Sequence, residues 1–95
     1  MKIKKEAICG TLESNDLLVK VVPFGGLQVS ISSEVMRQFG ARIREVVDET
    51  LKQMNVSQGK IVIEDKGALD CAIRARVQAA VLRGCDCEEL DWSVL

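Results

Sequence analysis

The stretch Gly10-Thr11-Leu12-Glu13-Ser14-Asn15-Asp16 bends the chain between two apolar runs. The run at 8–12 and the run at 17–22 have the composition of paired β-strands, and residues 13–16 between them are turn formers. Asn and Asp tolerate left-handed backbone conformations and hydrogen-bond to their own backbone, and Ser does so more weakly. The sequence therefore predicts a β-hairpin that exposes the hydroxyl group of Ser14 at its tip.

A third strand and a long helix are expected after the hairpin. Apolar and polar residues alternate at 27–32, which predicts a strand with one buried face. Residues 33–54 place apolar side chains at steps of three and four, which predicts an amphipathic helix with Ser32 and Ser33 as N-cap candidates. The apolar stripe consists of Val35, Phe39, Ile43, Val46, Val47, Leu51 and Met54.

The remaining elements are a strand and a second helix. A β-branched strand at 60–64 leads through a turn at 65–67 into a helix at 68–83, with Gly84 as its left-handed stop. The expected core face of this helix carries Leu69, Ile73, Val77, Ala80 and Val81. The order βββαβα predicts an α+β fold, a two-layer sandwich in which two helices cover one mixed four-stranded sheet.

Length and composition bound the class of protein. The 95 residues fit one domain, 1–95, with 85–95 as a tail that carries Trp92. A net charge of −1 leaves no broad basic face for nucleic acid, and no apolar run approaches the length of a membrane span. The first residues lack the apolar core of a signal peptide, so we expect a cytoplasmic protein.

The four cysteines are expected to be reduced thiols. Cys9 and Cys71 fall inside predicted elements and should be buried, whereas Cys85 and Cys87 in the tail should be alkylated first. A zinc site is disfavoured, because it needs about four ligands and the chain has no His.

Catalysis by this chain alone is also disfavoured. The chain has no His and no Tyr, and these are side chains often used as general acids or bases near neutral pH. No serine is accompanied by a base at a recognisable spacing, and there is no phosphate-binding loop or dinucleotide fingerprint. Arg74 and Arg76 on the second helix are solvated or ion-paired, or else they dock a partner.

Several strings taken together resemble the acyl carrier protein (gamma chain) family of citrate lyase. The most specific is Asp65-Lys66-Gly67-Ala68-Leu69-Asp70-Cys71. The others are Gly10-Thr11-Leu12-Glu13-Ser14, Ser32-Ser33 leading into Gln38-Phe39-Gly40 and Ile43-Arg44, and Arg74-Ala75-Arg76. The resemblance extends over essentially the whole chain.

The resemblance implies a non-catalytic carrier with no metal site and no catalytic residue. Ser14 would be joined through a phosphodiester to 2′-(5″-phosphoribosyl)-3′-dephospho-CoA, attached by a prosthetic-group transferase. The thiol of this arm would carry acetyl, which the alpha subunit would exchange for citrate. The beta subunit would then split the citryl thioester into oxaloacetate and acetyl thioester. Neither nucleic acid nor a membrane is implied as a partner.

Three alternatives remain open at the level of sequence. The carrier of malonate decarboxylase resembles this chain in scaffold and prosthetic group. A small interaction or RNA-binding sheet would need aromatic residues on an open strand face, where only Phe24 is available at a strand end. A stand-alone enzyme would have to show activity as an isolated chain.

Counting chain reversals predicts what lies around Ser14. The Ser14 turn, the starts of both helices and Lys66 should share one end of the domain, with Ser14 nearer to Gly67 and Ser33 than to Gly25 or Gly59. Strand, helix and strand at 27–64 should form a right-handed crossover. Free backbone N–H groups and two helix dipoles at that end would favour an anion, which gives the hypothesis that it receives the first phosphate of the arm.

Overall fold

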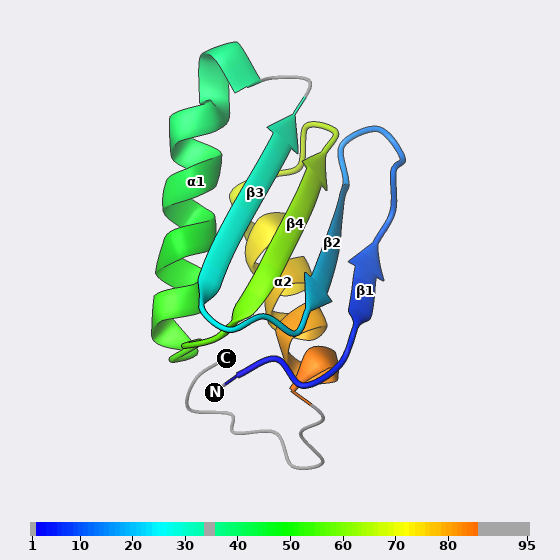
Figure 1. Cartoon of the computed structure of the whole chain (residues 1–95). Coiled ribbons are helices and arrows are strands. Elements are labelled where there is room, and N and C mark those ends of the chain that lie inside the picture. The colour runs from blue at the N-terminus through cyan, green and yellow to red at the C-terminus, as the bar shows by residue number, and fades with distance from the viewer. Residues whose placement is uncertain (1, 34–35, 86–95) are drawn as a thin grey trace.

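The structure is a computed structural model that describes residues 2–33 and 36–85, without the side chains of residues 36–40. Its elements follow the predicted order (Figure 1). They are β1 (Ala7–Gly10), β2 (Leu17–Val22), β3 (Leu27–Ser33), α1 (Met36–Gln53), β4 (Gly59–Asp65) and α2 (Asp70–Gly84).

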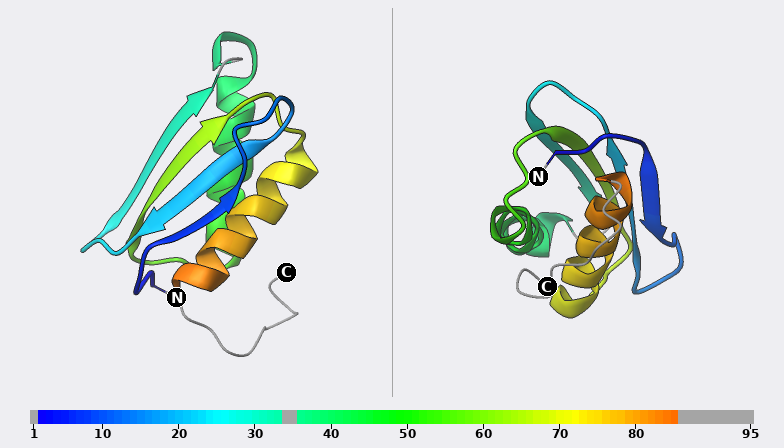
Figure 2. Two further views of the ribbon diagram at one scale, coloured as in Figure 1. Left: turned by 90° about the vertical axis from the view of Figure 1, so that its right-hand side faces the viewer. Right: turned by 90° about the horizontal axis from the view of Figure 1, so that it is seen from below.

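The strands form one mixed four-stranded sheet in the order β1-β2-β4-β3. The β1–β2 and β2–β4 pairs are antiparallel, and β3 and β4 are parallel because α1 carries the chain back between them. Both helices cover the same face of the sheet, and Figure 2 shows the other face uncovered by any described element. The predicted two-layer α+β sandwich is confirmed.

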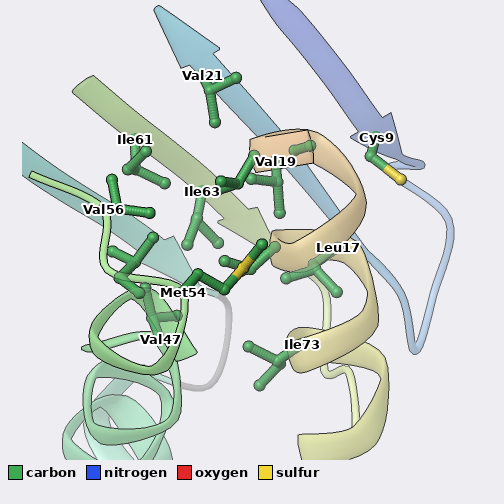
Figure 3. Packing of buried hydrophobic residues seen from close by; sticks show 14 of the residues in the cluster. Cys9, Leu17, Val19, Val21, Val47, Met54, Val56, Ile61, Ile63 and Ile73 are labelled. Atoms are coloured by element: carbon green, nitrogen blue, oxygen red, sulfur yellow. The ribbon is translucent and has the colours of Figure 1, made fainter. Parts of the chain in front are cut away.

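The core lies between the sheet and the two helices (Figure 3). Alternate residues of β2 and β4 point toward the helices, as the two-residue period of a strand requires, and these side chains are fully buried. The predicted stripe of α1 is buried from Ile43 to Met54. Each such side chain contributes about 1.5–3 kcal/mol when fully buried. The largest buried side chains include Leu17, Val19, Val21, Val46, Val47, Met54, Ile61, Ile63 and Ile73.

The ends of α2 differ from the prediction. The helix begins at Asp70, two residues late, because Leu69 has an extended backbone (φ −75°, ψ 159°). Leu69 is consequently 74% exposed and does not belong to the core face. Gly84 is not a left-handed stop either, because it lies inside the helix and Cys85 after it has right-handed backbone angles.

The reason for a glycine at position 84 is packing rather than backbone conformation. A Cβ atom there would lie 2.6 Å from Cγ2 of Val21 and 3.2 Å from Cγ2 of Ile3. The carbonyl oxygen of Gly84 also accepts hydrogen bonds from the N–H groups of Lys4 and Lys5, at 2.9 and 3.0 Å. The end of α2 therefore lies directly on β2 and on the N-terminal segment.

The cysteine predictions are only partly confirmed. Cys9 is buried as expected, but Cys71 is exposed and Cys85 is 4% exposed, so both of those predictions are wrong. Cys71 lies in the first turn of α2, where its side chain reaches the surface rather than the core. Cys87 and Trp92 lie outside the described residues.

Two further expectations concern the first helix and the membrane. Ser33 belongs to β3, and residues 34 and 35, between it and the start of α1 at Met36, lie outside the described residues. In the described part of the chain, no helix combines the length and the apolar character needed to span a membrane.

Candidate functional site

Ser14 is exposed in a turn of the connection between β1 and β2, and this connection lies at one end of the sheet (Figure 1). β1 ends at Gly10, two residues before the predicted end, because Gly10 has a φ of +105° that turns the chain out of the strand. The N–H of Thr11 donates to the carbonyl of Leu17 at 3.1 Å and closes the base of the turn. Asn15 adopts the left-handed conformation expected of a turn residue, with φ +64°.

The carboxylate of Asp16 holds the turn together. It accepts the hydroxyl of Thr11 at 2.8 Å and the N–H of Leu17 at 2.8 Å. From α2, Arg76 donates through Nε at 3.2 Å and through Nη2 at 3.0 Å, one bond to each carboxylate oxygen. These bonds, with that from Arg76 foremost, hold the pKa of Asp16 below its usual value, so the ion pair is fully formed at neutral pH.

The Ser14 turn is also joined to the loop between β4 and α2. The N–H of Asn15 donates to the carbonyl of Lys66 at 2.8 Å, and the N–H of Lys66 donates to the carbonyl of Asp16 at 2.9 Å. Ser33, at the end of β3, donates its hydroxyl to Asp65 at 2.8 Å.

The opposite end of the sheet is marked by a different contact, in which the N–H of Gly59 donates to the carbonyl of Gly26 at 2.7 Å. The prediction that the turn carrying Ser14 lies beside the Gly67 loop and the end of β3 is therefore confirmed. Figure 1 shows these segments together, with the 23–26 turn at the other end of the strands.

The amide groups of the β4–α2 loop are not free for an anion. Asp65 is 2% exposed, and its carboxylate accepts the N–H groups of Gly67 at 3.1 Å and Ala68 at 3.0 Å. The phosphate hypothesis requires free N–H groups at this end of the molecule, and these two already have an acceptor. Lys66, the extra contact that the hypothesis named, is partly buried in the same loop and makes interactions of its own.

A groove of about 650 Å³ opens beside the Ser14 turn, between the facing parts of α1 and α2. Arg42 of α1 reaches Asp70 of α2 across it, with Nη2 at 2.7 Å and Nε at 3.0 Å from the same carboxylate oxygen. This ion pair raises the pKa of Arg42 further above its usual value. The groove is lined by Asn15, Arg42, Ile43, Gly67, Ala68, Leu69, Asp70, Cys71 and Ile73.

Ser14 presents its hydroxyl group to solvent. Its hydroxyl makes no hydrogen bond to any residue in the described ranges, and the chain contains no His that could deprotonate it. The turn that carries this hydroxyl is closed by the bond from Thr11 to Leu17 and joined to the β4–α2 loop through Asn15.

Sequence reasoning misses the supporting residues of the site. It leaves Arg76 as a solvated, ion-paired or docking residue; in the structure Arg76 is ion-paired, whereas Arg74 makes no ion pair within the part of the chain that the structure describes. Asp16 and Asp65 are interpretable from the sequence only as turn formers. The sequence does offer one hint of their role. Each of these two carboxylates lies in a turn, and the predicted strand order places both turns at the same end of the sheet.

Comparison with known proteins gives one match to a family model and matches to full-length relatives that carry a different name. Residues 4–84 match the family model described as "Malonate decarboxylase delta subunit (MdcD)". The chain is 58% identical, over the full length of both chains, to the citrate lyase acyl carrier protein of Pectobacterium carotovorum. It is 59% identical to that of Albidiferax ferrireducens, with 100% of this chain and 99% of the relative covered.

The solved structures add evidence on the fold alone. A chain in the crystal structure of a Pseudomonas malonate decarboxylase hetero-tetramer in complex with malonate superposes with a TM-score of 0.72 over 84% of each chain. The sequence identity to that chain is 20%.

Proposed function

This chain belongs to the family of citrate lyase acyl carrier proteins, and we propose that Ser14 is the residue that bears its prosthetic group. It is the acyl carrier subunit of citrate lyase, a carrier that does not itself catalyse the reaction. The observation that carries the assignment of Ser14 is its place in the structure. It is an exposed hydroxyl without a hydrogen bond among the described residues, on a turn held by Asp16 and by the β4–α2 loop.

The residues around Ser14 are compatible with a large covalent group. The side chain belongs to a turn tip rather than to a strand, so a bulky substituent displaces no core residue. Asn15, bonded to Lys66, and Asp16, bonded to Arg76, fix the backbone after Ser14, and the bond from the Thr11 hydroxyl to Asp16 fixes the backbone before it. The turn can thus present the hydroxyl to a transferase without being reshaped by it.

We propose that the group is 2′-(5″-phosphoribosyl)-3′-dephospho-CoA, installed by a prosthetic-group transferase. When bound, it supplies the thiol on which acyl groups pass between the alpha and beta subunits of citrate lyase. The protein's own part is mechanical: it holds the attachment point rigid and leaves the reactivity to the arm and to larger partners.

The carrier of malonate decarboxylase is the nearest other assignment. The family model and the solved structure both carry that name, but the structure is only 20% identical to this chain. The citrate lyase carriers are 50–59% identical over 97–100% of their length. The weight of the comparisons therefore favours citrate lyase.

Intact mass tests the proposal. Co-production with the transferase and its precursor should raise the mass of the chain by one arm, and Ser14→Ala should abolish the increase. Ser30→Ala is a matched control, because Ser30 is also an exposed serine but lies within β3. A Ser14→Ala protein that still gains the arm would refute the assignment. Complementation of carrier-free citrate lyase, but not of carrier-free malonate decarboxylase, should distinguish the two complexes.

A further inference from the structure

The groove between α1 and α2 has no part in attaching a group to Ser14, yet it lies beside that residue. Its lining is mostly apolar, and Leu69 on its rim is 74% exposed. The extended backbone of Leu69 and the late start of α2 keep this side chain out of the core. A large exposed apolar side chain next to a concave surface is typical of a binding site.

The position of the groove indicates what occupies it. Asn15, which is covalently adjacent to Ser14, lines the groove, and Oδ1 of Asn15 lies 3.7 Å from the position that a Cβ at Gly67 would take. A group attached to Ser14 therefore begins at the rim. The volume of about 650 Å³ lies within the range of about 300–1,000 Å³ typical of small-molecule sites.

The polar groups of the lining suit a flat base with hydrogen-bonding edges. The amide side chain of Asn15 offers both a donor and an acceptor, and the α2 start at Leu69 has no side-chain cap, so its first-turn N–H groups have no side-chain acceptor there. Leu69 and Ile73 provide apolar contact for a ring face. Arg42 and Asp70, the two charged residues of this lining, are bonded to each other, so neither charge is left to select a phosphate.

We propose that, once Ser14 is modified, the adenosine part of its arm lies in this groove against Leu69 and beside Cys71. The inference rests on the proposed function, because it requires a nucleotide-containing arm on Ser14. Adenine is the part of the proposed arm that combines an apolar face with donors and acceptors at its edges. The arm then has a docked state, in which its nucleotide is held by the carrier, and an undocked state that can reach further.

Tethering makes even a weak contact effective. A short flexible linker gives the attached group an effective concentration of about 1 mM at a neighbouring site. A groove with an intrinsic Kd of about 0.1 mM would then be filled about 90% of the time. Docking of this strength reverses readily when a partner subunit takes up the arm.

The alkylation rate of Cys71 tests the proposal without any activity measurement. Cys71 is exposed in the groove, whereas Cys85 is buried and serves as an internal reference. Site-resolved peptide mass spectrometry would follow N-ethylmaleimide labelling of the full chain with and without the arm. Loading of Ser14 should slow labelling of Cys71 about tenfold, in line with occupancy of about 90%.

Two substitutions test whether the protection of Cys71 depends on the groove or is a general effect of the arm. Leu69→Ala should remove most of the protection of Cys71, because the apolar face of the base loses its contact. Leu27→Ala is the matched control, an exposed leucine on β3 that does not line this groove, and it should leave the tenfold ratio unchanged. Comparing loaded with unloaded protein for each variant cancels any change in the intrinsic reactivity of Cys71.

A second measurement identifies which part of the arm lies in the groove. Loaded protein should show nuclear Overhauser contacts between an adenine ring proton and the methyl groups of Leu69. With Ser14 modification confirmed by mass, an unchanged Cys71 rate or the absence of these contacts would overturn the groove proposal and leave the assignment of Ser14 intact. Absence of the arm from Ser14 would overturn both.

Discussion

At the scale of single residues, the geometry of the Ser14 turn depends on Asp16. Its carboxylate accepts four hydrogen bonds, which come from Thr11, from the Leu17 backbone and from both Nε and Nη2 of Arg76. Only 18% of the Asp16 side chain is exposed, so these bonds replace most of its hydration. Removing the negative charge would weaken both the bonds that close the base of the turn and the bonds that join the turn to α2.

We expect Asp16→Asn to lower the free energy of unfolding at pH 7 by about 1 kcal/mol, since bonds to a charged acceptor are exchanged for weaker ones and solvent screens part of the loss. The folded protein holds the pKa of Asp16 below 3.8. The stabilisation from this carboxylate is therefore complete above the unfolded-state pKa and is lost as the pH falls through the folded-state pKa. Urea unfolding of both proteins from pH 7 to pH 2 measures this difference.

Asp48→Asn is the control for this experiment, because the Asp48–Arg44 pair is about half exposed on both sides and should contribute within about 0.5 kcal/mol. A stability difference between wild-type protein and Asp16→Asn that grew toward low pH would contradict a lowered pKa for Asp16 in the folded protein.

Gly10 is the second residue on which the turn depends. Its φ of +105° is a conformation that L side chains rarely adopt, and an added Cβ would collide with the carbonyl oxygen of Leu17. We expect Gly10→Ala to cost more than about 2 kcal/mol of unfolding free energy. Gly25→Ala should change it by no more than about 1 kcal/mol, because a Cβ there meets nothing within 4 Å. Equal midpoints in urea for the two variants would contradict this explanation.

At the scale of elements, the sequence predicts those features of helices and strands that a local pattern of residues determines. The stripe of α1 is predictable because an amphipathic helix carries its burial pattern in the chain itself, and Ile43 and Leu51 are buried as expected. The start of α2 is not predictable in this way. Leu69 continues the apolar spacing, but Asp65 binds the N–H groups of Gly67 and Ala68, and Leu69 has an extended backbone, so the helix begins only at Asp70.

The candidate site likewise has one part that the sequence predicts and another part that only the folded structure shows. Ser14 can be singled out from a turn motif and a family resemblance. The pair formed by Asp16 and Arg76 cannot, because sixty positions separate the two residues and only the packing of α2 against β1 and β2 brings them together. The role of Gly84 is hidden from the sequence for a related reason, since its neighbours Val21 and Ile3 come from distant parts of the chain.

Gly84→Ala tests how closely α2 lies on the sheet. In an exposed helix this change would stabilise by about 1 kcal/mol. Here the new methyl group would lie 2.6 Å from Val21, and overpacking costs about 1–3 kcal/mol, so we expect net destabilisation of about 1 kcal/mol. The same change in a Val21→Ala background should be neutral or stabilising, and thermal unfolding of the four proteins measures the coupling. Simple additivity would contradict the close contact.

At the scale of the whole molecule, the two ends of the sheet have different roles. One end gathers the Ser14 turn, the end of β3, the β4–α2 loop and the groove, and the contacts there run between segments distant in sequence. The other end joins the 23–26 turn to the start of β4 through Gly59 and Gly26. The arm that we propose on Ser14 would have a fixed origin at this cross-linked end.

Hydrogen exchange tests whether this end is rigid. The N–H groups of Asn15 and Lys66 both donate across the two loops, whereas the N–H of Ser14 has no acceptor among the described residues. We therefore expect Asn15 and Lys66 to exchange about 100-fold more slowly than an unprotected amide, while Ser14 exchanges near the unprotected rate.

Arg76→Gln should lower the protection of Asn15 and Lys66, because Arg76 anchors the turn to α2 through Asp16. The amide of Gly59 bonds to Gly26 at the far end and should be unaffected, which makes it the internal control. Residue-resolved exchange by nuclear magnetic resonance distinguishes the outcomes. If Asn15 and Ser14 exchanged equally fast in the wild-type protein, the turn would be open in solution, and a rigid origin for the arm would have to be abandoned.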